Sequence, residues 1–417
     1  MQKDRQQEKF GLKTIKEDLL LMLKNRELLI LSFAVFVSMI GFGLIMPFLP
    51  KYAKTYGATK TQIGMMMGLF AVVRIFSSPL GGRLADKVGR KPLMVGGMFL
   101  YFIVMFLFGT ADSVPEIFLY RGAQGFASGL VWPVTYAYVG DIVKESERGK
   151  AMGLYSMSFA SGNAVGPILG GVIAVNFNYS IAFYFTSGLA LISAILLLIG
   201  IKESYEAEET IVKRKSIFNL KRYKLSEFTP HPKTFFALTV GSFTVFFGLA
   251  MVFPMLPIFA DEALGLGDLK IALIWAVMGF TQLLVMFPSG SLADRIGRKK
   301  LIVSGSVISA IFCGAISISF GFFSLAIIIA LYTLGRSMAR PSFPAFITSL
   351  TPKQKRGTGM GIYTFAQNMA WAGGSTVSGI IADGIGIHYP FLVALFVGLA
   401  GAFIISVSVE EPENLED

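Results

Sequence analysis

The sequence predicts an all-α integral membrane protein with twelve transmembrane helices in two parallel six-helix repeats. Three observations lead there: the 417 residues are 54% hydrophobic and only 15% charged, twelve apolar runs follow one another, and one charged motif occurs twice. Soluble domains carry about 25% charged residues. Because the deficit extends along the whole chain, a soluble protein is excluded.

The apolar runs have the length that a membrane span requires. A helix needs about 20 apolar residues to cross a hydrocarbon core of about 30 Å, where unpaired backbone groups are not tolerated. The first run follows 27 polar residues and lacks a small-residue cleavage site, so we interpret it as a retained span. The predicted spans are 28–50, 62–82, 92–111, 116–140, 151–174, 181–201, 234–260, 270–290, 300–320, 323–347, 357–381 and 390–409.

The distribution of lysine and arginine predicts the topology, because cytoplasmic loops are enriched in these residues. With the N-terminus inside, 29 of the 37 basic residues fall in cytoplasmic segments, four in outside loops and four inside spans. The net charge of +11 is then a topology signal, and we expect no nucleic-acid partner. We predict a multi-pass plasma-membrane protein with both termini in the cytoplasm.

The longest polar loop divides the chain into two sets of six spans. We predict six-helix bundles over 28–201 and 234–409, joined by a cytoplasmic linker over 202–233 and followed by a cytoplasmic tail over 410–417. Residues 1–27 are expected in the cytoplasm. They either form an amphipathic helix on the inner leaflet or are the solvated start of the first helix.

An internal repeat relates the two sets of spans. The segment LADKVGRK at 84–91 recurs as LADRIGRK at 292–299, with six of eight residues identical. The same offset of 208 residues aligns Pro133 with Pro341. Parallel repeats of this kind place a substrate site between the halves near the middle of the membrane, and rocking of the halves opens it to each side in turn.

The repeated motif carries a family resemblance. Gly82–Lys91 and Gly290–Lys299 both read G-x-x-x-D-[RK]-x-G-R-K, and with these residues the chain resembles the major facilitator superfamily over nearly its whole length. The resemblance implies a latch that closes the inner side, in which the aspartate meets the start of the eleventh helix near Gly357 and the basic residues pair with an acid at the inner end of the fourth helix. The alternative is that these charges only set the topology. The predicted latch residues are Gly82, Asp86, Gly89, Arg90, Lys91, Asp141, Gly290, Asp294, Gly297 and Arg298.

A glycine-rich motif, SGNAVGPILGG, occupies 161–171 in the fifth span. Its glycines at four-residue steps share one helix face, and its proline removes one backbone hydrogen bond. Such a ridge suits close packing between the two halves, and we interpret it as a pivot; small residues used only for packing are the alternative. It resembles the fifth-span motif of the drug/proton antiporters, as GFGLIMPFLP at 41–50 resembles their first-span signature. The predicted pivot residues are Gly162, Gly166, Pro167, Gly170 and Gly171.

Four arginines are predicted inside spans, where an ionisable group is costly and therefore a candidate site. Arg121 and Gln124 stand in YRGAQG, which resembles the fourth-span motif associated with proton coupling; a structural role against carbonyls or acids is the alternative. Arg336 and Arg340 share one face of the tenth span, and the resemblance places that helix at the cavity. For Arg74 a helix–helix hydrogen-bonding role is an equal alternative.

Carboxylates are predicted to be absent from the middle of the membrane, since all 26 Asp and Glu residues map to loops, tails or span ends. Many proton-driven exporters of cationic drugs use a buried carboxylate, so cation export is weakened here. An anionic or neutral lipophilic substrate that meets the arginines gains support. Residues expected on the remaining cavity wall, each of which alone more often faces lipid or core, are Phe42, Met46, Trp132, Tyr136, Asn163, Phe246, Tyr332 and Tyr363.

Together these features predict a secondary active transporter that exports amphipathic small molecules by alternating access, with proton coupling. The alternatives are an exporter of organic anions, a lipid flippase of the same fold, or a non-transporting receptor or sensor. We expect no enzyme activity, cofactor or metal, because the chain has one cysteine, two histidines and no evident nucleophile–base pair. The expected partners are the lipid bilayer, a small amphipathic substrate and protons, and we expect a monomer.

Overall fold

The computed structural model describes residues 25–204, 229–352 and 355–410, and within these residues the regular secondary structure is entirely helical. The predictions for residues 1–24 and 411–417, and for most of the linker, lie outside the described residues. So do the side chains of 286–291 and 293–295, which include the predicted latch residues Gly290 and Asp294.

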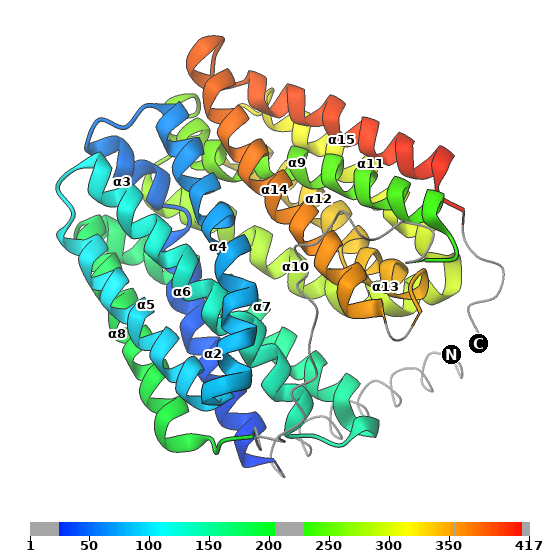
Figure 1. The fold of residues 1–417 in the computed structure, drawn as a ribbon. Helices are drawn as coiled ribbons and strands as arrows, with labels where there is room; N and C mark the ends of the chain where they lie inside the picture. The colour runs from blue at the N-terminus through cyan, green and yellow to red at the C-terminus, as the bar shows by residue number, and fades with distance from the viewer. Residues whose placement is uncertain (1–24, 205–228, 353–354, 411–417) are drawn as a thin grey trace, which may run out of the picture.

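The helices fall into two groups along the chain, which we call the first half and the second half (Figure 1). The first half contains α2 (Arg26–Ile45), α3 (Leu49–Thr55), α4 (Lys60–Val88), α5 (Arg90–Thr110), α6 (Val114–Asp141), the short 3-10 helix η1 (Glu145–Glu147), α7 (Arg148–Asn176) and α8 (Tyr179–Gly200). The second half contains α9 (Pro232–Glu262), α10 (Asp268–Ile296), α11 (Arg298–Ile316), α12 (Phe322–Ala339), α13 (Ser342–Ser349), α14 (Arg356–Gly384) and α15 (Tyr389–Ser408).

The helices match the predicted spans. Ten helical stretches in the described residues are long and apolar enough to cross a membrane. The helices α6 and α14 do not belong to those ten, although they have 28 and 29 residues. All twelve predicted apolar runs therefore correspond to helices, and the predicted all-α membrane fold is confirmed.

Proline interrupts two of the predicted spans. The first span breaks into α2 and α3 at Pro47, and the tenth breaks into α12 and α13 at Pro341. Proline has no amide hydrogen and its ring crowds the preceding turn, so it favours such breaks. The second half accommodates Pro254 and Pro257 inside the continuous helix α9, although they align with prolines of the first span.

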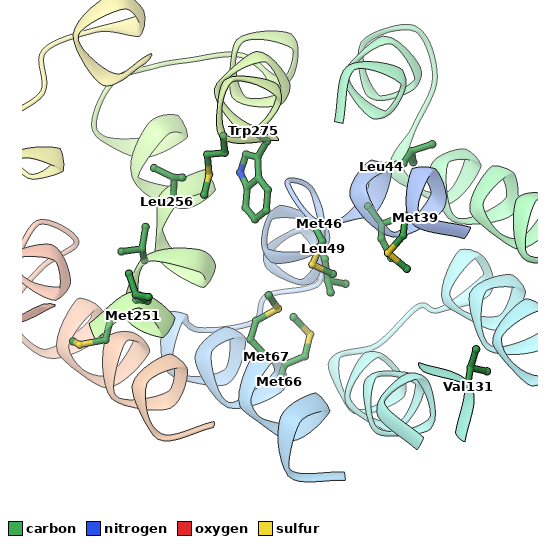
Figure 2. Packing of buried hydrophobic residues seen from close by; sticks show 14 of the residues in the cluster. Met39, Leu44, Met46, Leu49, Met66, Met67, Val131, Met251, Leu256 and Trp275 are labelled. Carbon is green, nitrogen blue, oxygen red and sulfur yellow. The ribbon is translucent and has the colours of Figure 1, made fainter. Parts of the chain in front are cut away.

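Methionine is prominent in the interior. Met39 of α2 and Met46, which follows that helix, are at most 5% exposed, as are Met66 and Met67 of α4 (Figure 2). Methionine is unbranched and polarizable, so it fills irregular gaps between helices.

The two halves meet mainly through two helix pairs, α4 with α14 and α7 with α10, and through smaller contacts of α9 with α3 and α4. In the first pair, a Cβ atom on Gly68 would lie 2.8 Å from the carbonyl oxygen of Ala372, and one on Gly64 would collide with the backbone of Ser375. In the second pair, a Cβ atom on Gly279 would lie 2.5 Å from Cα of Ala164. Only glycine permits these backbones to approach so closely.

Helices α4 and α14 lie close together near α3 and diverge toward their opposite ends (Figure 1). A Cβ atom on Gly82 of α4, on Gly153 of α7, or on Gly357 and Gly361 of α14 would meet nothing within 4 Å. We call the end where the halves touch the closed end, and the opposite end the open end.

Candidate functional site

Ion pairs join the halves at the closed end. Nζ of Lys51 in α3 lies 2.8 Å from Oδ1 of Asp261 and 2.5 Å from Oδ1 of Asp268. The hydroxyl of Tyr179 donates to Oδ2 of Asp268 at 3.0 Å. Burial lowers the pKa of Lys51, but its hydrogen bonds to the two carboxylates outweigh burial and hold that pKa above its ordinary value. Lys51 therefore stays charged and ties α9 and α10 to the first half.

Two further contacts strengthen this end. Glu262 accepts ion pairs from Lys54 at 2.7 Å and from Lys60 at 3.0 Å. Asp383, at the end of α14, accepts hydrogen bonds from the backbone N–H of Lys60 at 3.2 Å and of Thr61 at 2.7 Å. This places a carboxylate at the N-terminus of α4, where the helix dipole favours negative charge.

Sequence reasoning did not predict these closed-end pairs. A usable signal was present, because Lys51 and Lys54 follow the first span and Asp261 and Glu262 follow its counterpart in the second half. Opposite charges at related positions of a parallel repeat indicate a contact between the repeats.

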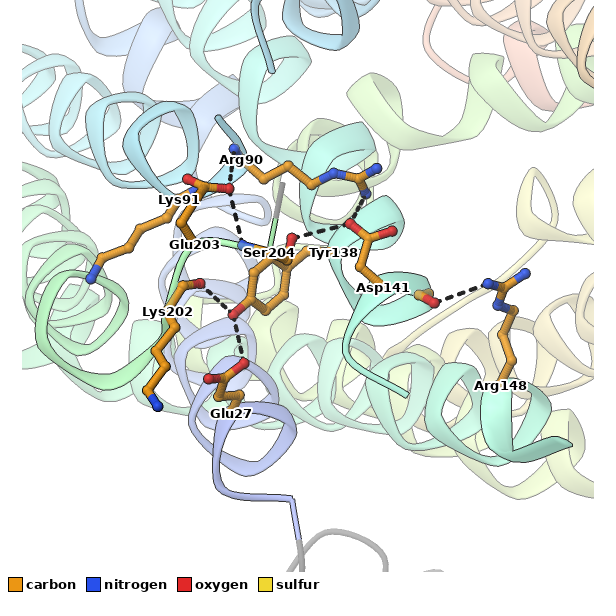
Figure 3. A network of polar contacts seen from close by, with 10 residues as sticks. Glu27, Arg90, Lys91, Tyr138, Asp141, Arg148, Lys202, Glu203 and Ser204 are labelled. Atoms are coloured by element: carbon orange, nitrogen blue, oxygen red, sulfur yellow. Dashed lines mark hydrogen bonds and ion pairs between the residues drawn. The ribbon is translucent and has the colours of Figure 1, made fainter. Parts of the chain in front are cut away.

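At the open end, a polar network joins α5, α6 and the first residues of the linker (Figure 3). Arg90 Nη1 lies 2.6 Å from Oδ2 of Asp141, which also accepts a hydrogen bond from the hydroxyl of Ser204 at 3.1 Å. The carboxylate of Glu203 accepts from the backbone N–H groups of Arg90 at 2.9 Å and Lys91 at 3.1 Å. The acid thus caps α5.

The predicted latch is only partly assembled. Its pairing of Arg90 with Asp141 is present, but the predicted contact of Asp86 with the start of α14 is not made, because Asp86 is exposed and Gly357 faces open space. The physical reason is that α4 and α14 separate at the open end. The two turn glycines, Gly89 and Gly297, have matching φ values of 95° and 92°, so both copies of the motif form the same turn. In the second copy, Arg298 donates to the carbonyl oxygen of Ala345 at 3.0 Å.

The glycine ridge of α7 faces a different partner from the one predicted. Gly162, Gly166 and Gly170 pack against the backbone of α2 in the same half. Pro167 is buried. Among the four predicted pivot glycines, Gly171 alone meets the other half, at Ala272 of α10. The prediction of packing between the halves is therefore wrong for the first three glycines. Four-residue spacing defines a helix face, but it does not identify the helix that covers that face.

Arg121 is buried within the first half. Its side chain is 2% exposed, donates to the side-chain oxygen of Gln124 and to Met67 Sδ, and lies 4.5 Å above the ring of Phe70. Gln124 donates in turn to the hydroxyl of Tyr101 at 2.9 Å. Arg121 and Gln124, which the sequence placed in one motif, are thus in contact, and none of the ion pairs described above includes Arg121.

Two of the other predicted arginines, Arg336 and Arg340, lie one helical turn apart in the second half. Arg336 of α12 donates to Oε1 of Gln282 at 3.4 Å and lies 5.3 Å from the ring centroid of Phe253. Arg340 is exposed and lies within electrostatic range of Arg336 and of Arg74 from α4. The structure therefore groups three of the four predicted arginines and keeps the fourth, in α6, apart.

The predicted wall residues divide between the halves. In the second half, Phe246 and Tyr363 flank Phe343, with ring centroids 5.9 and 6.3 Å away, and Tyr332 is fully buried beside Arg336. The predicted wall residues of the first half contact other residues of that half. Phe42 packs on Phe70, Trp132 on Phe159 and Tyr136 on Tyr155. Met46 lies in the core, and Asn163 donates to Met39 Sδ and to the Phe159 carbonyl oxygen.

Comparison with protein families accounts for this doubled architecture. The sequence model of the Major Facilitator Superfamily matches residues 31–237 and 238–417, which gives one match for each half. The chain belongs to the Major Facilitator Superfamily.

Within this superfamily the chain is similar to proteins named for drug resistance. It is 28% identical to Multidrug resistance protein 2 of Bacillus subtilis over 93% of this chain and 96% of that protein. It is 23% identical to the Quinolone resistance protein NorA of Staphylococcus aureus over 94% of this chain and 99% of NorA. A solved POT family transporter in complex with 5-aminolevulinic acid shares the superfamily fold with a TM-score of 0.79, at 16% identity, over 92% of this chain and 96% of the other.

Proposed function

We propose that this chain is a secondary active transporter that exports amphipathic small molecules across the cell membrane by alternating access, driven by protons. One observation carries the proposal: the helix pairs that bring the halves together touch at one end and face open space at the other. Two repeats that meet at one end only are one conformation of a rocking pair. The relatives named for multidrug and quinolone resistance support export of drug-like molecules.

The orientation follows from the basic residues. Residues 83–91, 144–150, 295–300 and 353–356 hold many of the lysines and arginines and flank the open ends of the spans. Because cytoplasmic loops are enriched in these residues, we assign the open end to the cytoplasm. The closed end, with Lys51 and Asp383, then faces outward, and a substrate enters from the cell interior or the inner leaflet. We further propose that one chain suffices for transport, without enzymatic chemistry.

We assign the coupling role to Arg121. Its guanidinium is enclosed by α4, α5 and α6, and its contacts are neutral groups: Gln124, Met67 and the ring of Phe70. A charge so placed is costly and is by default functional. Protonation elsewhere in the first half would change the field at this arginine, and the arginine would respond by exchanging partners.

The test is transport by purified protein in proteoliposomes with an imposed pH gradient. We expect movement of fluorescent amphiphiles to follow the gradient and to stop when the gradient is dissipated. The Arg121→Gln variant should lose gradient-dependent movement, whereas the matched exposed variant Arg83→Gln should keep it. Uptake indifferent to the gradient would refute proton coupling, and the absence of any protein-dependent movement would refute transport.

A further inference from the structure

A group of cations in the second half has no carboxylate partner among the described residues. The ion pairs described above lie at the closed end, around Lys51 and Glu262, and at the open end, between Arg90 and Asp141. None of them includes Arg336 or Arg340. Unpaired charges at membrane depth are expensive, so proteins keep them where something compensates the charge.

The two arginines border a small cavity between α9, α11, α12 and α13. The cavity has a volume of about 10 Å³, which holds a single oxygen-sized group. Ser306 lines it, and its hydroxyl is buried at 1% residue exposure without a hydrogen-bond partner. Buried hydroxyls are normally satisfied. A polar atom supplied by a ligand would satisfy Ser306 and lie next to Arg336 and Arg340.

Apart from Ser309, whose hydroxyl donates to the carbonyl oxygen of Ser306 at 3.0 Å, the rest of the cavity lining is apolar and aromatic. Phe246 and Phe343 line it together with Val245 and Leu249. The buried ring of Tyr363 from α14 stacks behind Phe343 and supports this wall. Sites with few polar anchors on an apolar wall accept ligands that have an apolar body and one polar end.

The orientation of Arg336 also favours a ligand of negative charge. Gln282 and the ring of Phe253 hold its guanidinium from the α10 and α9 sides, which fixes its position without neutralising it. Arg340, one helical turn along, is exposed, and Arg74 of the other half adds a third positive charge within range. A cation entering this region would meet three like charges.

We infer that this region binds an amphipathic organic anion, a carboxylate or sulfonate on an aromatic body. One oxygen of its headgroup lies at Arg336, Arg340 and Ser306. Its ring system packs on the partly exposed Phe246, behind which the buried Phe343 supports that ring. We call these five residues the arginine site. Charge-assisted hydrogen bonds from arginine to such headgroups are the stronger kind. The inference rests on the proposed function for one point only, that the bound anion is a transported substrate.

The test is equilibrium binding, which needs no transport. Purified full-length protein in detergent is titrated by calorimetry with 2-naphthalenesulfonate and with 2-naphthylmethylammonium, which share an aromatic body and differ in charge. Protein-free detergent is titrated as the blank. We expect the sulfonate to bind at least tenfold more tightly than the ammonium. The Arg340→Gln variant should weaken sulfonate binding about tenfold or more, because it removes a charged hydrogen bond.

Two controls keep the result interpretable. Lys300→Gln removes one positive charge from an exposed residue at the start of α11 and should leave binding unchanged. Arg340→Lys keeps the charge and should restore part of the affinity, which a variant that merely unfolds the protein cannot do. Equal binding of the two probes, preference for the ammonium, or a thermal shift with chloride alone would overturn the inference.

The arginine site and the proposed transport function can be refuted independently of each other. Sulfonate binding without any gradient-driven movement in proteoliposomes would refute the proposed transport and leave the arginine site standing. Gradient-driven export restricted to cations would refute the arginine site and leave the transporter standing.

Discussion

Replacing Gly68 by alanine should weaken the closed end. The added Cβ atom would lie 2.8 Å from the carbonyl oxygen of Ala372, whereas ordinary contact begins at 3.4 Å. The obstructing atom belongs to the backbone, so no side-chain rotation relieves the collision. Helices α4 and α14 must therefore separate by about 0.6 Å at this crossing.

The separation would reach the neighbouring cap. A rigid displacement of that size takes the backbone nitrogen of Lys60 from 3.2 Å to about 3.8 Å from Asp383, past hydrogen-bonding distance. Overpacking costs about 1–3 kcal/mol, and a single methyl group with this overlap belongs at the lower end. At about 1.4 kcal/mol per factor of ten, we expect the closed state to lose about fivefold in population. Gly68→Val, with two more methyl groups, should lose more.

Spin-label distances measure this population directly. The chain has one cysteine, Cys313, which is buried, so a Cys313→Ser background accepts labels at Thr55 and Lys270, on opposite halves of the closed end. The longer-distance population should grow in Gly68→Ala. The control is Gly188→Ala, because a Cβ atom there meets nothing within 4 Å and reports only the effect of alanine on helix stability. An unchanged distance distribution in Gly68→Ala would refute the reasoning.

Three further substitutions test other contacts. Lys51→Ala should open the closed end by about two- to tenfold in the same distance measurement, as expected for a partly buried ion pair, and Lys51→Arg should reverse most of this. Because the pKa of Lys51 is raised, the stabilisation that its ion pairs give to the closed state is complete below the ordinary pKa of 10.5 and is lost only above the raised value. The difference in closed-state population between the parent protein and Lys51→Ala should therefore stay constant from about pH 7 to pH 10. Glu203→Ala should lower the free energy of unfolding by about 1 kcal/mol, because the α5 cap is lost, whereas Glu145→Ala at an exposed residue should leave it unchanged. Gly166→Ala should lower the free energy of unfolding by about 1–3 kcal/mol and reduce the yield of monodisperse protein on size exclusion, because the added methyl group would overpack the first half. Gly153→Ala should be neutral, because a Cβ atom there meets nothing within 4 Å.

The sequence was sufficient for the fold because its strongest signals are periodic. Apolar runs of spanning length and a motif repeated at a fixed offset depend on local composition, and both survive in a single sequence. The turn at Gly89 and its copy at Gly297 could be predicted for the same reason, since a glycine there permits a positive φ.

The site was less predictable, because its contacts depend on which helices become neighbours and in which conformation. The spacing of Gly162 and Gly166 identified a shared face, but not α2 as its partner. The predicted contact of Asp86 with α14 belongs to a conformation closed at the end that is open here. Gly64 and Gly68, which bring α4 against α14, went unnoticed because glycine inside an apolar run has no distinctive pattern until the neighbouring backbone is known.

The charges of the closed end are sorted by half. The first half supplies Lys51, Lys54 and Lys60, and the second half supplies the carboxylates that pair with them, which are Asp261, Glu262 and Asp268. Each half therefore recognises its complement and repels a copy of itself. If the chain were cut in the linker and the two fragments were produced together, each first-half fragment should associate with a second-half fragment. Attraction between their opposite charges would favour this pairing before the helices pack together.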